Sequence, residues 1–255
     1  MSDVPSNNHG SDAGDTSAAR QPHAVLDLPS RRFKGLKIER LLALADRPQP
    51  IRMLEAGTGS GGIAHYFGTH PQLRCEVDAV DVHDNRLVTE GYNYHQVHDT
   101  HLPFSDRTFD VVLTNHVIEH VGDKQAQRAH LAELHRVLRP DGVGYLAVPN
   151  RWMLVEPHYK LAFLSWLPYE WRTPYLRAMG KGDEYDCEPL QVGQAQQMLA
   201  EAGFRYRNLC LDALRATLEI ERSKSLAARM LRRVPDGILM PMNRLIPTLI
   251  YKFWP

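Results

Sequence analysis

The sequence predicts an α/β fold, in which a sheet is covered by helices, and two observations carry the prediction. Residues Ile51–Phe67 pass from an apolar run through an acid and a glycine cluster to apolar residues at helical spacing. This order is typical of a strand, a tight turn and the start of a helix. The chain has 255 residues and 43% hydrophobic content, enough to bury one substantial α/β core.

The turn in this first unit is suited to a bound ligand. Gly57, Gly59 and Gly61 can adopt positive φ angles and let a ligand approach bare backbone. The N–H groups of the following helix then point toward that ligand. The spacing of Gly57, Gly59 and Gly62 also satisfies the G-x-G-x-x-G pattern of nicotinamide and flavin enzymes, so the turn alone leaves the cofactor open.

Three later segments extend the pattern. Cys75–Val82 reads as a strand ending at Asp81, roughly twenty residues past the glycines, where an acid can accept hydrogen bonds from both ribose hydroxyls. Leu102–Val121 reads as a turn, a buried strand around Val111, Val112 and Leu113, and a polar rim. Leu138–Asn150 is expected to end a helix at Pro140 and Gly142 and to open another strand.

The remaining elements are expected from periodicity and from start and stop signals. Met1 to about His23 is poor in large apolar residues, and residues 1–25 are predicted to be a disordered tail. The other expected elements are a helix over Arg32–Ala45, a helix capped by Asp123 and running to Leu138, a helix over Glu188–Gly203, and strands over Phe204–Leu211 and Pro247–Pro255.

These blocks resemble the motifs of class I S-adenosylmethionine-dependent methyltransferases of the small-molecule, type 11-like kind. The resemblance covers roughly residues 35–150 and, more weakly, 188–255. It implies a Rossmann-like, seven-stranded, mostly parallel sheet of order 3-2-1-4-5-7-6, with helices on both faces and an antiparallel strand at Pro247–Pro255. Residues 26–255 would form a single domain with insertions at about 151–187 and 212–246.

The resemblance also implies S-adenosyl-L-methionine as the cofactor. Glu55 and the block from Asp110 to His120 favour this reading over a nicotinamide enzyme. Asp141-Gly142 departs from the common Gly-Gly, and Asp99, the candidate for holding the adenine amino group, stands one residue from the commonest spacing. The residues expected at the cofactor are Glu55, Gly57, Thr58, Gly59, Gly61, Asp81, Val82, Asp99, Asn115 and His116.

The two insertions are expected to distinguish this chain from its relatives. Residues 151–187 are dense in aromatic side chains, which suit rings, sugars and lipid chains, so Trp152, Tyr159 and Trp166 are predicted to contact the acceptor. The alternative is that these aromatics only pack the insertion onto the sheet. Residues 212–246 carry basic side chains between leucines, a pattern of helices on anionic membranes and, more often, of solvated faces over a core.

Methyl transfer from a sulfonium is an in-line displacement that depends mainly on alignment of the nucleophile. A hydroxyl or phenol acceptor would benefit from a base, and His116, His120 and His158 are the candidates. No metal is expected, because the adjacent Glu119 and His120 would point apart on a helix. The predicted activity is methyl transfer to an O, N or C nucleophile of a small-molecule, glycan or lipid-linked acceptor. Alternatives are an NAD(P)-dependent oxidoreductase and a non-catalytic S-adenosylmethionine-binding scaffold.

Composition narrows the partners and the compartment. A formal charge of zero gives no indication of nucleic-acid binding. Three widely spaced cysteines argue against a disulfide framework and a zinc site, and for a reducing compartment. No signal peptide or run of about 18 apolar residues is evident. The expected location is the cytoplasm, with the 212–246 insertion as a candidate peripheral contact with the inner face of a membrane.

Overall fold

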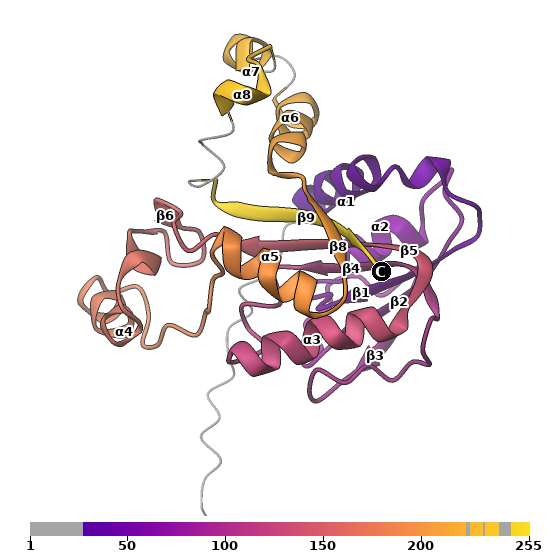
Figure 1. Cartoon of the computed structure of the whole chain (residues 1–255), viewed down its shortest axis with the longest axis horizontal. Helices are drawn as coiled ribbons and strands as arrows, with labels where there is room; N and C mark the ends of the chain where they lie inside the picture. Colours follow the sequence, from indigo (N-terminus) through magenta and orange to yellow (C-terminus); the bar gives the residue numbers. More distant parts are fainter. Residues whose placement is uncertain (1–27, 223–224, 232, 240–245) are drawn as a thin grey trace, which may run out of the picture.

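A computed structural model describes residues 28–222, 225–231, 233–239 and 246–255. The predicted disordered tail at residues 1–25 lies outside these ranges, as do residues 223–224, 232 and 240–245 of the second insertion. The described residues form a central sheet with helices on both faces and a smaller lobe beyond one edge (Figure 1).

The main sheet has seven strands in the order β3-β2-β1-β4-β5-β9-β8. Only β9 runs antiparallel to its neighbours β5 and β8. Counted within this sheet the order is 3-2-1-4-5-7-6, which confirms the order implied by the resemblance. The strands are β1 (Ile51–Ala56), β2 (Cys75–Asp81), β3 (Asn93–Gln96), β4 (Phe109–Asn115), β5 (Leu138–Pro149), β8 (Arg205–Asn208) and β9 (Thr248–Trp254).

Helices cover the two faces of the sheet and bury two apolar clusters. On one face α1 (Leu28–Leu42), α2 (Gly62–Gly68) and α6 (Cys210–Ile220) pack over residues such as Met53 and Tyr145. On the other face α3 (Lys124–Val137) and α5 (Val192–Glu201) pack over Leu54 and Leu146. Alternate residues of β1 and β5 therefore point into the apolar clusters on opposite faces of the sheet. This is why the sequences of these strands are nearly continuous apolar runs.

Several predicted boundaries were wrong because tertiary contacts decide where the elements end. The helix after Asp123 stops at Val137, and β5 already begins at Leu138, which pairs with Phe109. The expected helix over Glu188–Gly203 begins at Val192, where Gln191 caps it. The expected strand over Phe204–Leu211 ends at Asn208, whose side chain accepts a hydrogen bond from the first residue of α6. The first helix starts at Leu28, and after it ends at Leu42 a short 3-10 turn, η1 (Leu44–Asp46), follows.

The first insertion forms its own small lobe beyond the carboxyl ends of the parallel strands (Figure 1). It contains β6 (Val155–Glu156), β7 (Leu161–Ala162), the 3-10 turn η2 (Leu164–Trp166) and α4 (Tyr169–Ala178). Its buried cluster is Leu161, Leu164, Leu176, Tyr185 and Cys187. A bridge between Asn150 and Leu190 joins the two ends of the lobe, so its base is fixed to the sheet.

The second insertion begins as a core helix. Helix α6 packs on α1, where Lys37 donates a 2.7 Å hydrogen bond to Thr217 and forms an ion pair with Glu221. Within its described residues, α7 (Leu226–Leu231) and α8 (Asp236–Leu239) follow above α6 (Figure 1). The start of this insertion is therefore a helix that packs over the core and turns its other face to solvent, which was one of the two predicted alternatives.

Candidate functional site

The strand register brings three predicted cofactor residues into one row. Ala56 of β1 pairs with Val80 of β2 and with Thr114 of β4. The residues that follow, Gly57, Asp81 and Asn115, therefore stand side by side at the carboxyl edge of the sheet. This edge is where ligands bind in parallel α/β sheets.

The glycine turn is shaped by close contacts with the protein itself. Gly57 has φ +79°, and a Cβ there would lie 2.1 Å from Val117 Cγ2. Gly61 has φ +76°, and its Cβ would lie 2.2 Å from the hydroxyl of Tyr92. Both positions therefore require glycine for conformation and for space.

The carboxyl groups of two acidic residues hold this turn. Glu55 is buried, and its Oε2 accepts hydrogen bonds from Thr58 Oγ1 at 2.7 Å and from the backbone N–H of Ala64 at 2.9 Å. Burial raises the pKa of Glu55 to about 8, although these hydrogen bonds oppose the shift. Asp81 Oδ2 accepts a 2.8 Å hydrogen bond from Gly59 N, so the acid expected at the ribose also orders the turn.

The residues around the turn fit a polar nucleoside ligand. The Ser60 hydroxyl and the Asn115 side-chain oxygen are buried without a hydrogen-bond partner among the described residues. A carboxylate such as Asp81 has lone pairs beyond those that its backbone donors occupy. Val82 is 44% exposed at the end of β2. Asp99 is exposed, and its side chain accepts a 2.7 Å hydrogen bond from His101 N, so among the described residues no hydrogen bond ties it to the turn.

His116 stands at the end of β4 in a left-handed conformation, with φ +58°. Its N–H donates to Ala147 O at 2.8 Å, and its Nδ1 lies 3.2 Å from Glu119 Oε1. Burial lowers the pKa of His116 below its ordinary value, although Glu119 opposes the shift. A neutral imidazole beside the glycine turn can accept a proton.

The prediction that Glu119 and His120 point apart on a helix was wrong. Residues 118–120 form a turn, and the ligand atoms of Glu119, His120 and His158 all lie within 4.8 Å of one another. Gln127 holds this turn by donating to Ile118 O at 3.1 Å. The reason for expecting no metal therefore fails.

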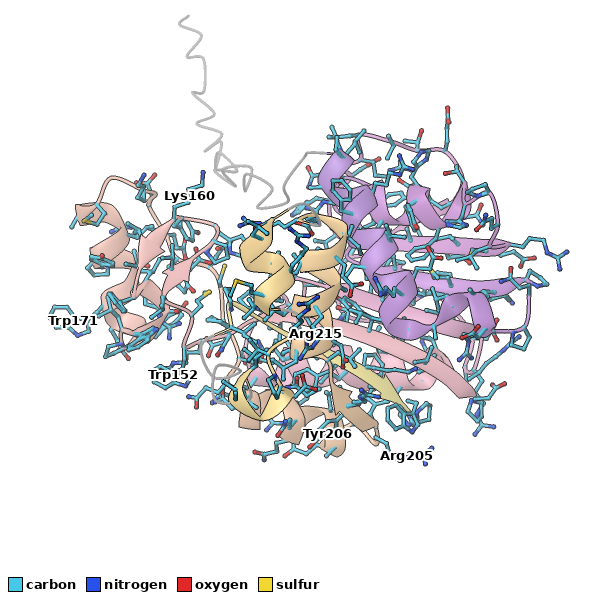
Figure 2. All side chains as sticks on the ribbon, turned by 90° about the horizontal axis from the view of Figure 1, so that it is seen from above. Trp152, Lys160, Trp171, Arg205, Tyr206 and Arg215 are labelled. Carbon is cyan, nitrogen blue, oxygen red and sulfur yellow. The ribbon has the colours of Figure 1, made fainter. Side chains whose placement is uncertain are left out.

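The three predicted acceptor residues divide between two places. Tyr159 donates to Asp186 Oδ1 at 3.1 Å and so belongs to the histidine cluster. Trp152 and Trp166 form a separate pair with ring centroids 5.6 Å apart, and each is 37% exposed. Figure 2 shows Trp171 at the outer end of the lobe and Trp152 at its rim, nearer to the rest of the molecule.

Three residues near the histidines were not among the predicted site residues. Glu156 Oε1 lies 2.6 Å from His158 Nδ1, and Cys187 Sγ lies 3.8 Å from His120 Nδ1, with Asp186 beside it. Glu156 could have been found from the sequence, because it stands only two residues before His158. The sequence gave no indication of Asp186 and Cys187, because they reach His120 only through tertiary contacts such as the 2.9 Å hydrogen bond from Glu188 N to Glu119 O.

The row of Gly57, Asp81 and Asn115 lies within a stretch of sequence that matches a known family. A family model described as "Methyltransferase domain" matches residues 30–208. The chain belongs to this family, whose cofactor is S-adenosyl-L-methionine. This confirms the resemblance predicted from the glycine turn and the blocks that follow it.

Individual relatives agree with this membership. The chain is 25% identical over 183 residues to a ubiquinone biosynthesis O-methyltransferase of Parvibaculum lavamentivorans, covering 66% of this chain and 64% of the relative. It is 30% identical over 110 residues to a ubiquinone/menaquinone biosynthesis C-methyltransferase of Desulfotalea psychrophila, covering 40% and 43%. The matches thus span less than two thirds of either relative.

The solved structures support the same fold. A crystal structure of a SAM-dependent methyltransferase from Methanosarcina mazei is 15% identical, with a TM-score of 0.53 over 84% of this chain and 96% of that one.

Among the described residues, no helix is long and apolar enough to cross a membrane.

Proposed function

We propose that this protein transfers the methyl group of S-adenosyl-L-methionine to a small-molecule acceptor. The observation that carries the proposal is the row of Gly57, Asp81 and Asn115 at the carboxyl edge of the sheet. In this proposal Asp81 accepts hydrogen bonds from the ribose hydroxyls, and Gly57 holds the turn beside it in the left-handed conformation, packed against Val117. The bound sulfonium supplies an already activated methyl group, so this chain contributes alignment and exclusion of water.

His116 is the residue we propose as proton acceptor when the acceptor is a hydroxyl or phenol. It follows Asn115 directly, and Glu119 lies 3.2 Å from its Nδ1, which fixes the ring. General bases of this kind contribute roughly 10²–10⁴-fold to the rate. A carbon or nitrogen nucleophile that needs no deprotonation would make this residue dispensable.

The acceptor we propose carries an apolar ring or chain. Exposed aromatic side chains gather on the first insertion, with Phe163 at 50% and Trp171 at 66% exposure. The names of two relatives refer to ubiquinone biosynthesis, which supports a ring-bearing, lipid-linked acceptor as the finer hypothesis. Peripheral membrane contact through residues 212–246 would suit such an acceptor, since Leu226, Met230 and Ile238 are each at least 67% exposed.

The test is product formation. The full chain is incubated with S-adenosyl-L-methionine and fractionated cell extract, the release of S-adenosylhomocysteine is measured, and the methylated product is identified by mass spectrometry. Asp81→Ala serves as the donor-site control and should release much less. Binding of the donor without release of product in any fraction would favour the non-catalytic alternative, and binding of NADH instead would favour the oxidoreductase.

A further inference from the structure

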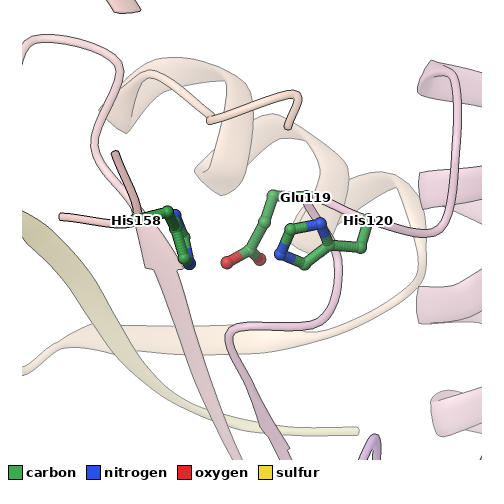
Figure 3. A group of neighbouring side chains, drawn as sticks. All are labelled: Glu119, His120 and His158. Atoms are coloured by element: carbon green, nitrogen blue, oxygen red, sulfur yellow. The ribbon is translucent and has the colours of Figure 1, made fainter. Parts of the chain in front are cut away.

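A compact group of metal-ligand side chains lies where the first insertion meets the sheet. The ligand atoms of Glu119, His120 and His158 lie within 4.8 Å of one another. Figure 3 shows the carboxylate of Glu119 between the two imidazole rings. We propose that Glu119, His120 and His158 bind a divalent transition-metal ion, with Zn²⁺ as the best match to this ligand set.

The burial of Glu119 is the first independent argument. Glu119 is 1% exposed, and neither of its carboxylate oxygens makes a hydrogen bond of normal geometry within the described part of the chain. His116 Nδ1 lies 3.2 Å from Oε1, but burial lowers the pKa of this imidazole, which disfavours its cationic form. The compensation for this buried carboxylate therefore comes from imidazoles such as His116 and His120, which are not permanent cations, and a metal ion held between the two imidazoles of the cluster would compensate it fully.

The groups behind the histidines are a second argument. Glu156 is buried, its Oε1 lies 2.6 Å from His158 Nδ1, and its Oε2 accepts a 2.8 Å hydrogen bond from Tyr159 N. A carboxylate that accepts the Nδ1 proton of a histidine directs the Nε2 lone pair toward a metal. On the second ring, His120 Nδ1 lies 3.8 Å from Cys187 Sγ. The proposal therefore assigns Nε2 of both histidines as ligand atoms, with Glu156 and Cys187 as outer partners.

The size and chemistry of the site fit Zn²⁺. At metal–ligand distances of about 2.0–2.2 Å, the ligand atoms of a tetrahedral site lie about 3.3–3.6 Å apart. The ligand atoms of the three side chains lie within 4.8 Å of one another. Side-chain rotations that shorten these separations by a little over an ångström would bring the atoms to tetrahedral spacing. Two imidazoles and one carboxylate also occur in catalytic zinc sites that keep one position open, and a similar set binds Fe²⁺. The proposal does not depend on methyl transfer.

The test is calorimetric titration of the chelator-treated full chain with ZnCl₂. The wild-type protein should bind one equivalent. Glu119→Gln, His120→Ala and His158→Ala should each weaken binding about 100-fold or more, whereas Glu156→Gln, which alters an outer partner, should weaken it about 10–100-fold. His98→Ala removes an exposed histidine outside the cluster and should bind zinc as the wild type does.

Two outcomes would overturn the proposal: no stoichiometric zinc binding by the wild-type chain, or binding by the three ligand variants that equals that of His98→Ala. If circular dichroism shows that the variants are unfolded, X-ray absorption of the zinc-loaded wild type decides. A first shell of nitrogen and oxygen at about 2.0–2.2 Å supports the assignment, and a sulfur ligand at about 2.3 Å contradicts it. Calorimetry with S-adenosyl-L-methionine on the same samples tests the proposed function separately.

Discussion

The Gly57→Ala substitution tests how the glycine turn is held. The sequence suggested that a side chain there would occupy the space of the cofactor, but the structure shows that its Cβ would first meet Val117, at 2.1 Å from Cγ2. The left-handed conformation at φ +79° costs about 1–2 kcal/mol for a residue with a Cβ. Overpacking adds about 1–3 kcal/mol. The free energy of unfolding should therefore fall by about 2–5 kcal/mol.

Two other glycines separate these contributions. Gly180 has φ +62° with no atom within 4 Å of its added Cβ, so Gly180→Ala should lose only the conformational part, about 1–2 kcal/mol. Gly193 is the second residue of α5, with no atom within 4 Å of its added Cβ, so Gly193→Ala should gain no more than the roughly 0.5–1 kcal/mol of a helix interior. Adding Val117→Ala to Gly57→Ala removes the contact between the new Cβ and the valine side chain. The double variant should therefore recover part of the lost free energy of unfolding, which a double-mutant cycle measures.

Urea unfolding of these four variants and of Val117→Ala, which completes the cycle, gives the stabilities, and calorimetry with S-adenosyl-L-methionine gives the affinities. Gly57→Ala should also weaken donor binding tenfold or more, because Val117 must move and its neighbour His116 with it. The reasoning is refuted if Gly57→Ala and Gly180→Ala lose the same free energy of unfolding, or if Gly57→Ala binds the donor as the wild type does.

Three further predictions follow from particular residues. Folding raises the pKa of Glu55 from 4.5 to about 8, so the folded chain binds this proton more tightly than the unfolded chain does. The free energy of unfolding should therefore fall by up to about 5 kcal/mol as the pH rises from about 4.5 through about 8. Glu55→Gln should remove that fall in unfolding curves measured across this range, and an unchanged pH profile would contradict the assignment. Trp166→Ala should lower turnover of the true acceptor about tenfold, which corresponds to about 1.4 kcal/mol, and should leave the affinity for the donor unchanged. If the variant loses donor binding and thermal stability together, Trp166 serves to pack the lobe and does not contact the acceptor. Deletion of Thr248–Pro255 removes β9 from between β5 and β8 and should abolish the cooperative thermal transition, whereas an unchanged melting temperature would be incompatible with an internal strand.

The sequence could predict the parts of this molecule that depend on local patterns. Ile51–Ala56, the glycine turn and Asp81 follow from apolar runs, glycine spacing and an acid at a strand end, and the structure has all three. Asp123 was predicted to cap a helix, and its side chain accepts from Gln125 N and Ala126 N. The strand order followed from family resemblance, since single-sequence patterns carry no pairing information.

The histidine cluster could not be predicted, because it is assembled by contacts between distant segments. Gln127 donates to both Ile118 O and Glu188 O, which joins the turn after β4 to the end of the first insertion. That link carries Asp186 and Cys187 to His120. Glu119 and His120 were expected to point apart on a helix, but these contacts hold a turn at residues 118–120, and the two adjacent side chains converge.

The central claim is that the row of Gly57, Asp81 and Asn115 binds S-adenosyl-L-methionine, and calorimetry tests it most directly. The wild-type chain should bind one equivalent of S-adenosyl-L-methionine and should not bind NADH. Asp81→Ala should weaken donor binding by about 1–3 kcal/mol through the loss of charged hydrogen bonds. Binding of NADH without binding of S-adenosyl-L-methionine, or equal donor affinity in wild type and Asp81→Ala, would contradict the claim.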